Sequence, residues 1–408
     1  MKTFKLKELG EFKNGLNFNQ DDYGVGYPII NVKQLYKSRF ASIENLHELK
    51  LDFKNNIDGY FIKKNDLLFV RGSMVPSGAG QAVMVNDFLP GTVFSGFIIR
   101  FRTTNFSKII PLFLNYLLRS PLCREKFVRI ASGSVHSNMT QDILGNFEVE
   151  LPDLETQKQI LSVLDSIDSK IEIIEKNNFI LEKIIQSIYK SWFIDFDGQT
   201  EFVDSELGPI PKGWTSSKLG DILSLLRDGS HNPPLRVEKG ISFITGGTLN
   251  FVIEYDKATY ITDEDYHKIQ RNYQLQENDL MLSTVGTLGN VAIVRATDLP
   301  LSHQRSAAML RVNEKANFVF LYCLIKSPGF KLFLDTHQTR TAQPSIFLGT
   351  LSSFAFVLPS TKLLDSFFRL GFPLIKKMQD NCSSILILEK IRDSLLPKLM
   401  SGEIQVKV

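Results

Sequence analysis

The chain has 408 residues, which is enough for two domains of ordinary size. Its 47 Lys and Arg residues against 44 Asp and Glu give a formal net charge of +3, which excludes a histone-like polycation. Hydrophobic residues make up 43% and charged residues 22%, so we expect a folded protein with a sizeable core rather than a disordered chain.

Cysteine and histidine spacing argues against a disulfide framework and against a metal site. Cys123, Cys323 and Cys382 are odd in number and far apart, with no CxxC pair, and the six histidines include no HxxxH pair. No apolar segment of signal-peptide type opens the sequence, and no apolar run approaches the length of a membrane span. We therefore expect a reduced, cytoplasmic protein with no metal of its own.

The sequence repeats itself once. Five short stretches recur in the same order at separations of 207 to 213 residues, among them NDLLFV (65–70) with NDLMLS (278–283) and LLRSP (117–121) with LIKSP (324–328). One such match is weak, but five in order indicate a tandem duplication.

The first part of each copy, 1–152 and 199–358, alternates short apolar runs with glycine turns. Strands are predicted in GYPIINV (26–32), NDLLFV and FSGFIIRF (94–101), and a short helix in FLNYLLRS (113–120). The second copy offers the same series. We expect two similar mixed α/β domains, each with a curved or barrel-like sheet and helices at its rim.

The second part of each copy, 153–198 and 359–408, is predicted to be a long helix. Apolar residues follow alternating steps of four and three, which is the seam of a coiled coil with period 3.5. In the first helix this seam contains one polar residue, Asn178, and consists of Ile160, Leu164, Ile167, Ile171, Ile174, Asn178, Leu181, Ile185, Ile188 and Trp192.

The second helix repeats that seam with defects. Gly371 and Arg392 occupy two positions expected to be apolar, and Pro373 lies in the first turns. Proline removes a backbone donor and collides with the preceding turn, so we expect the helix to fray or bend there.

We predict that the two helices pair antiparallel. A register with Ile160 opposite Leu399 also sets Asn178 opposite Asn381, so that two buried amides bond each other instead of remaining unpaired. Alternatively, both asparagines face solvent. Opposite net charges, −4 for 151–200 and +3 for 359–408, favour the pairing. The residues expected in the contact are Asn178, Asn381, Ile171, Ile174, Ile385 and Leu388.

This pattern predicts an α+β protein in which two similar domains are separated by a coiled-coil spacer of two antiparallel helices, with a pseudo-two-fold repeat. Two similar domains at a fixed spacing suit two separated DNA half-sites. Residues 1–150 carry a net charge of +5 and 201–358 a net charge of −1, so the second domain must gather its basic residues on one face to bind phosphate.

Several motifs resemble those of the specificity (S) subunit of type I restriction–modification systems, over essentially the whole chain. They are LPDLETQKQI (151–160) at the start of the first helix, SIYKSWFIDF (187–196) at its end, EFVDSELGPIPKGW (201–214) before the second domain and LLPKLMSGEIQV (395–406). Leu364 stands where the first copy has Gln157, so the second helix-opening motif is degraded.

The resemblance implies a division of labour. Target recognition domain 1 (1–152) and target recognition domain 2 (199–358) would each read one half of a bipartite double-stranded DNA target. Helices 153–198 and 359–408 would set the gap and dock two modification (methyltransferase) subunits, which restriction (motor-nuclease) subunits join. The chain itself would be non-catalytic and bind no cofactor, with S-adenosylmethionine, ATP and Mg²⁺ on the partner subunits.

Polar loop residues near strand ends are the candidate DNA contacts, because Arg pairs with guanine, Asn and Gln pair with adenine, and Lys binds phosphate. Each could equally be a solvated turn residue. The candidates are Lys33, Arg71, Ser73, His136, Asn138, His231, Asn232, Arg236, Ser283, Thr284, His303, Gln304, Arg305, Arg340 and Gln343. Among them, SGSVHSN (132–138) and TRTAQPS (339–345) align between the copies.

Two other functions fit parts of the sequence. Asn232-Pro233-Pro234-Leu235 is similar to the tetrapeptide of amino-methyltransferases, but Leu235 replaces the aromatic ring that would stack on the flipped base. No glycine-rich turn with a following acid is present to bind the methyl donor, so a stand-alone methyltransferase is disfavoured. A structural adaptor that joins two protein-binding domains through a coiled coil is the other alternative.

Overall fold

The computed structural model describes residues 1–36, 38–50, 57–72, 78, 80–132, 138–232, 234–271 and 273–406. Contacts divide the chain into two compact units, which are unit 1 (Met1–Glu172 with Leu386–Val408) and unit 2 (Ile173–Ile385). The boundaries of the four segments expected from the sequence stay a prediction.

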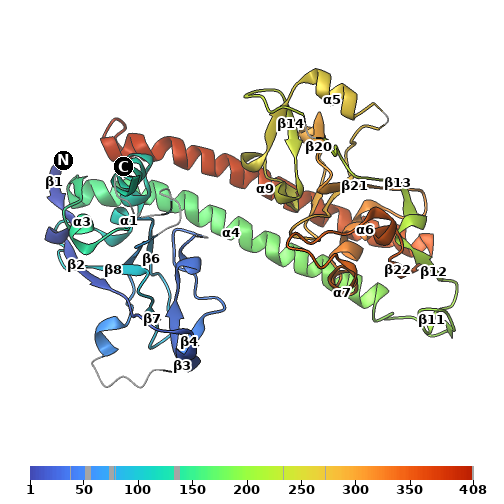
Figure 1. Cartoon of the computed structure of the whole chain (residues 1–408), viewed down its shortest axis with the longest axis horizontal. Helices are drawn as coiled ribbons and strands as arrows, with labels where there is room; N and C mark the ends of the chain where they lie inside the picture. The colour runs from blue at the N-terminus through green and yellow to red at the C-terminus, as the bar shows by residue number, and fades with distance from the viewer. Residues whose placement is uncertain are drawn as a thin grey trace. The chain divides into compact units, whose positions relative to one another are not determined.

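In its described residues, unit 1 contains three small sheets and three short helices besides its parts of the two long helices. Figure 1 shows the arrangement of these elements. The four-stranded sheet has the order β2 (Gly10–Asn14), β8 (Ile98–Thr103), β5 (Leu67–Val70), β6 (Ala82–Met84). The three-stranded sheet has the order β4 (His47–Leu49), β3 (Tyr23–Ile30), β7 (Val93–Phe94), and β1 (Lys2–Lys5) pairs with β9 (Glu148–Leu151). The helices are α1 (Pro111–Arg119), α2 (Pro121–Ser132) and α3 (Gln141–Gly145).

Unit 2 repeats this topology strand for strand. Its four-stranded sheet has the order β13 (Leu223–Arg227), β21 (Ala307–Val312), β18 (Leu280–Ser283), β19 (Val291–Ile293). Its three-stranded sheet has the order β17 (Thr259–Ile261), β14 (Ile241–Ile244), β20 (Leu301–His303), and β12 (Thr215–Lys218) pairs with β22 (Ala355–Leu358). The helices α6 (Phe318–Ile325), α7 (Pro328–His337) and α8 (Leu348–Ser352) follow in the order of α1 to α3.

Smaller elements complete the fold. Unit 2 also contains the pairs β10 (Phe202–Val203) with β11 (Ile210–Pro211) and β15 (Leu249–Asn250) with β16 (Val252–Ile253), and helix α5 (Asp263–Ile269). Short 3₁₀ turns lie at Leu6–Glu8, Gln20–Asp22, Val32–Leu35, Ile57–Tyr60, Leu219–Ile222, Gly246–Thr248, Tyr255–Lys257 and Ala296–Asp298.

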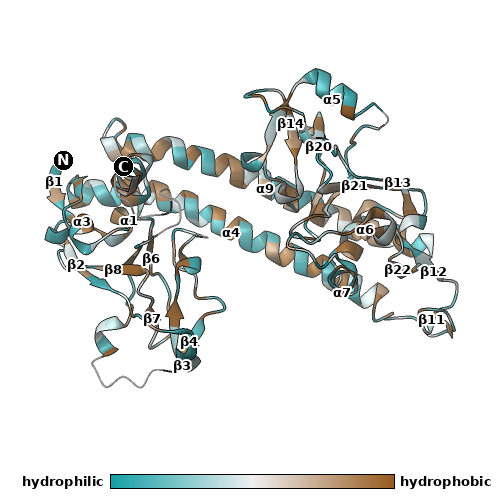
Figure 2. Ribbon diagram, viewed as in Figure 1, coloured by the Kyte–Doolittle hydropathy of each residue, from teal (hydrophilic) through white to brown (hydrophobic). Residues whose placement is uncertain are grey.

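The four-stranded sheet is buried on both faces, which corrects the expectation of one curved or barrel-like sheet. Successive strand residues point to opposite faces. In unit 1, Leu67 and Phe69 pack with the helices, whereas Leu68 and Val70 pack in a second core with residues of the three-stranded sheet such as Ile30. Figure 2 shows hydrophobic residues in the neighbouring strand β8 of this sheet. Because both faces need cover, the strands form two layers rather than one closed sheet.

The NDLLFV and NDLMLS motifs owe their similarity to a buried ion pair at the start of β5 and β18. Arg102 binds both oxygens of Asp66, with its closest contact at 2.7 Å, and Arg311 binds Asp279 in the same way. The preceding residues Asn65 and Asn278 both have positive φ, near 72° and 71°. Asparagine adopts this conformation more readily than most residues, which accounts for the Asn-Asp pair in each copy.

Helices α4 (Leu154–Phe193) and α9 (Thr361–Ser401) contribute to both units, and in each unit their contacts run antiparallel. In unit 2, the Asn381 Nδ2 donates to the Asn178 Oδ1 at 2.7 Å, which confirms the predicted amide pair. Ile171 and Ile174 are buried, while Ile385 and Leu388 are half-buried. In unit 1, Ile160 and Leu164 share a core with Leu399.

The expected defects of the second helix are not defects in the structure. Helix α9 is continuous through Pro373. Gly371 lies where α9 closely approaches its neighbours, because a Cβ there would be 2.6 Å from Val319 Cγ1 and 2.9 Å from Ile185 Cδ1. Arg392 forms an ion pair with Asp168 of α4 at 2.9 Å. Each irregularity in the seam therefore has a partner within its own unit.

Candidate nucleic-acid interface

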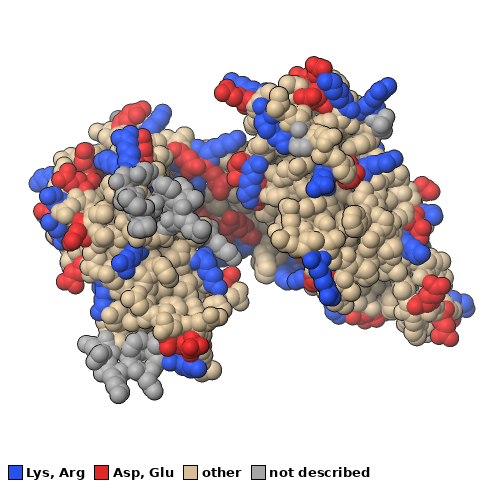
Figure 3. Space-filling view, in the orientation of Figure 1, with Lys and Arg blue, Asp and Glu red and all other residues tan. Residues whose placement is uncertain are grey.

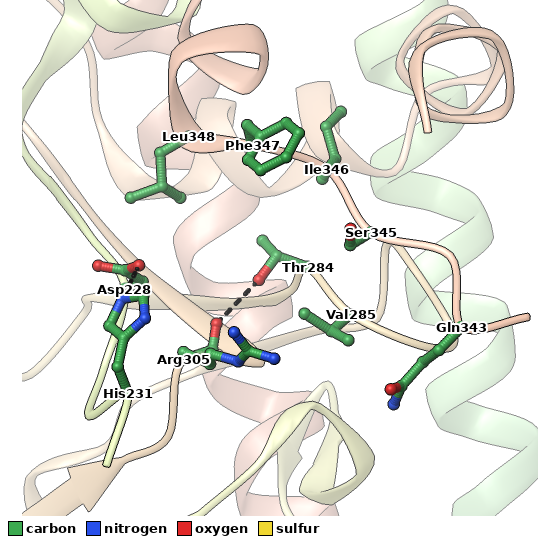
Figure 4. A pocket seen from close by; sticks show the side chains of 10 residues that line it. All are labelled: Asp228, His231, Thr284, Val285, Arg305, Gln343, Ser345, Ile346, Phe347 and Leu348. Carbon is green, nitrogen blue, oxygen red and sulfur yellow. Dashed lines mark hydrogen bonds and ion pairs between the residues drawn. The ribbon is translucent and has the colours of Figure 1, made fainter. Parts of the chain in front are cut away.

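A hollow of about 210 Å³ with a mixed polar and apolar lining opens in unit 2 where four loops meet (Figure 4). The loops follow β13, β18 and β20 and precede α8. Backbone hydrogen bonds join them: Arg305 N donates to Ser230 O at 3.1 Å, Thr284 N to Ser306 O at 2.9 Å and Ile346 N to Thr284 O at 3.0 Å. The walls are Asp228, His231, Thr284, Val285, Arg305, Gln343, Ser345, Ile346, Phe347 and Leu348.

The hollow brings together four of the residues singled out in the sequence, namely His231, Thr284, Arg305 and Gln343. The side chains of His231, Arg305 and Gln343 are exposed, and Figure 4 shows Arg305 between the other two. Thr284 is buried, and its hydroxyl donates to the Arg305 carbonyl at 3.2 Å. The exposed trio can offer hydrogen bonds to a ligand, whereas Thr284 fixes the floor beneath them.

Asp228 was not foreseen, and it determines how His231 is held. The His231 Nε2 lies 2.7 Å from the Asp228 Oδ2. Since a carboxylate only accepts hydrogen bonds, we assign the ring hydrogen to Nε2. Asp228 is the first residue of the loop after β13, three residues before His231, and its role could not be predicted from residue type alone.

Ser283 and His303 are a correction to the candidate list, because both are fully buried. The Ser283 hydroxyl donates to Thr287 O at 2.6 Å and accepts from Asn290 N at 2.8 Å, so it closes the turn after β18. His303 Nδ1 donates to Ala307 O at 2.7 Å, and burial lowers the pKa of the ring to about 4. Both side chains lie in the interior and offer no surface to DNA.

The remaining candidates of unit 2 lie outside the hollow. Arg236 donates to Pro234 O at 3.1 Å and covers the Phe243 ring at 4.3 Å. Gln304 is half-buried and accepts from the Ser306 hydroxyl at 3.2 Å. Asn232 and Arg340 are exposed on neighbouring loops.

Unit 1 carries the same backbone framework. Gly96 N donates to Leu16 O at 2.6 Å, Arg71 N to Phe97 O at 2.9 Å and Met139 N to Arg71 O at 2.7 Å, which match the three loop bonds of unit 2. The alignment of 132–138 with 339–345 agrees with this framework. Asn138 forms an isolated antiparallel β-bridge with Gly72, and Ser345 forms the same kind of bridge with Val285.

The candidates of unit 1 are only partly gathered on that framework. Arg71 is half-buried and donates to Gly96 O at 3.3 Å, and Asn138 is exposed beside it. Lys33 lies elsewhere, 3.2 Å from the His47 Nε2. Ser73 and His136 fall outside the described residues.

Comparison with known proteins identifies the chain. The family described as the type I restriction modification DNA specificity domain matches residues 1–183 and 211–363, which is most of the sequence and covers both copies of the repeat. The chain belongs to this family of specificity subunits.

Relatives of the specificity family cover nearly the whole chain. The type I restriction enzyme MjaIX specificity subunit of Methanocaldococcus jannaschii is 31% identical and covers 99% of this chain and 93% of its own length. The HindI specificity subunit of Haemophilus influenzae is 24% identical, with coverage of 99% and 100%. A crystal structure of a type I system S subunit from M. genitalium shares the fold, with a TM-score of 0.56 at 15% identity over 98% of this chain and 95% of that one.

The helix-opening motif of the specificity family has a structural explanation in the first copy. The Gln157 side chain is fully buried, accepts from Ile110 N at 3.0 Å and donates to Lys108 O at 2.8 Å. It thus ties the start of α4 to the segment before α1. Leu364, its counterpart in α9, is buried in the core of unit 2 instead, which explains how the degraded motif is tolerated.

Some residues of this specificity subunit's surface were missed by sequence reasoning. Asn17 occupies the place of His231 on the unit 1 framework, and Phe97 and Phe347 are 68% and 70% exposed beside the same loops. An aromatic residue gives no sign in the sequence that its ring will face solvent. The correspondence of Asn14-Gly15 with Asp228-Gly229 was the available signal for the loop of Asn17.

The surface charges are mixed, and the described residues contain no metal-binding cluster. On the face in Figure 3, basic and acidic side chains are interspersed over each unit. No group of three or more His, Cys, Asp or Glu residues suited to a metal ion occurs among the described residues. In that same part of the chain, no helix combines the length and apolar character needed to cross a bilayer.

Proposed function

We propose that the chain is the DNA-recognition subunit of a type I restriction–modification complex, in which unit 1 and unit 2 each read one half of a bipartite target. The observation that carries this proposal is the repeated loop framework. Both units present exposed polar side chains from the same set of backbone-bonded loops, with different residues at matching places, such as Asn17 and His231. One scaffold with two sets of side chains suits two different half-sites.

The chemistry of the unit 2 hollow fits base edges. An Arg side chain supplies parallel donors for guanine, and a Gln side chain pairs with adenine in the major groove. Arg305 is exposed, so its guanidinium can reach a ligand in the hollow.

Two equivalent apolar patches support two copies of one docked partner. On α4, Phe179, Ile180 and Ile184 are exposed, and on α9 their repeat equivalents Leu386, Ile387 and Ile391 are exposed too, all between 42% and 62%. Large apolar side chains that gather on a surface mark protein contacts. Since the duplication placed the same patch twice, we propose that each binds one modification subunit.

In this proposal the chain itself carries out no chemistry. The modification subunits would bind S-adenosylmethionine and transfer the methyl group, and the restriction subunits would use ATP and Mg²⁺. The chain would supply the choice of site on double-stranded DNA and the distance between the halves.

The alternative function is a structural adaptor, which shares the helices and the patches but needs no DNA. To separate the two, DNA binding by the chain together with its modification subunit is measured over a range of salt concentrations. The proposal predicts specific binding that weakens steeply with salt, because phosphate contacts release counterions. Absence of sequence-specific binding by the assembled complex would favour the adaptor.

A further inference from the structure

We infer that Asp228 and His231 act together to read a base that carries an exocyclic amino group, adenine or cytosine, in the half-site of unit 2. The inference rests on the proposed function, which makes unit 2 a reader of DNA. His231 would contact the base. Asp228 would be a positioning residue that acts through the ring of His231.

The hydrogen bond to Asp228 fixes which nitrogen of the neutral His231 ring faces outward as an acceptor. Asp228 Oδ2 accepts from His231 Nε2 at 2.7 Å, so in the neutral ring Nδ1 carries no hydrogen. Nδ1 has no hydrogen-bond partner among the residues that the structure describes, and the side chain is 63% exposed. A bare ring nitrogen accepts a hydrogen bond, and in the major groove the donors are the adenine N6 and cytosine N4 amino groups.

The Asp228 carboxylate is not needed to hold the loop. Tyr273 donates its hydroxyl to the Asp228 carbonyl at 3.2 Å, and Ser230 N donates to His303 O at 3.0 Å. The Ser230 hydroxyl donates to Asn232 O at 2.8 Å. These contacts anchor the loop through its main chain. The carboxylate therefore has His231 as its partner, and an exposed pair of this kind adds little to stability.

The other polar groups of the hollow leave a place for the acceptor that the His231 ring supplies. Arg305 brings only donors to the hollow, and Gln343 brings an amide that can donate and accept. Figure 4 shows Asp228 and His231 at the opposite side from Gln343. With Nδ1 of His231 as an acceptor, the hollow can distinguish a base edge that donates from one that only accepts.

The test uses the full chain assembled with its modification subunits. The complex methylates a plasmid pool with randomised inserts, and the methylated sequences are read out. We expect wild type to prefer adenine or cytosine at one position of the unit 2 half-site. Asp228→Ala should reduce that preference about tenfold and leave the other half-site unchanged. His231→Ala should relax the same position, and the double variant should add nothing further.

The control is Glu264→Ala, which removes the same charge from an exposed ion pair with Lys268 on α5, away from the hollow. It should leave every position unchanged. The inference is overturned if Asp228→Ala or His231→Ala keeps the full base preference at every position of that half-site. Either result leaves the proposed function intact as long as the wild-type complex binds its target specifically. If the wild-type complex binds no target specifically, the proposed function itself is refuted.

Discussion

At the scale of single residues, the paired amides of Asn178 and Asn381 connect the sequence most directly to the structure. Each seam contains one asparagine, and the antiparallel register that places Ile160 opposite Leu399 also places these two asparagines opposite each other. The hydrogen bond of 2.7 Å agrees with that geometry. Asn178 also donates to Met378 O at 3.4 Å, so the amide is supported from two sides.

Replacement of one of the two asparagines should lower the free energy of unfolding more than the replacement of both together. Asn178→Leu leaves the Asn381 amide without its partner in a largely buried place, so we expect a loss of about 1–3 kcal/mol in the free energy of unfolding. In the double variant, Asn178→Leu with Asn381→Leu, two apolar side chains meet, and the loss should be well below the sum of the single losses. Denaturant unfolding of the full chain measures each value.

The matched control for this cycle is Asn250→Leu, an exposed asparagine of unit 2. Its effect should stay within about 0.5 kcal/mol, as for ordinary surface substitutions. If the two single losses simply add in the double variant, the amides do not stabilise each other and the explanation of the register is wrong.

Residue type predicted part of the candidate interface, and three-dimensional context decided the rest. His231, Arg305 and Gln343 do line one hollow. Ser283 and His303 have equally suitable side chains, but both are fully buried, with the Ser283 hydroxyl and the His303 Nδ1 bonded to nearby main chain. The sequence shows which polar groups are present but not which hydrogen bonds they form. The hydrogen bond between Asp228 and His231 was missed for the same reason.

At the scale of elements, the spacing of apolar residues along the chain correctly predicted where the strands and helices lie. Strands and helices lie where the apolar runs are, and the seam of α4 and α9 is buried as expected for Ile171 and Ile174. The layering of the sheets was not predicted, because a continuous apolar strand does not reveal what covers its second face. Gly371 was misjudged for a similar reason, since close approach of Val319 and Ile185 is a property of the fold.

The two apolar patches lead to a prediction about stoichiometry. Ile180→Glu places a charge in the patch on α4, and Ile387→Glu does the same on α9. Each single variant should bind one modification subunit instead of two, and the double variant should bind none, because an unpaired charge in an apolar contact is costly. Native mass spectrometry of the assembled complex counts the subunits.

Both residues are more than half exposed, so the folded chain should tolerate the substitutions. Leu332→Glu, on α7 of unit 2 and 67% exposed, is a matched control outside the patches and should keep two subunits bound. Retention of both subunits by the double variant would show that the patches serve another purpose.

At the scale of the whole molecule, the internal duplication organises everything else. It accounts for the matching sheets, for the ion pairs of Asp66 and Asp279 and for the two patches. The side chains on the two loop frameworks differ while the backbone bonds beneath them agree. In physical terms, the scaffold is constrained by burial and hydrogen bonding, whereas the exposed loop tips are free to vary.

The most direct test of the central claim, that each unit reads its own half of the target, is a map of methylated sites after one recognition domain is exchanged. Residues 1–152 are replaced by the corresponding domain of another specificity subunit, and the methylated genome of cells that carry the complete system is sequenced. We predict that one half of the bipartite target changes, while the other half and the gap stay as they were. A change in both halves, or in neither, would contradict the account.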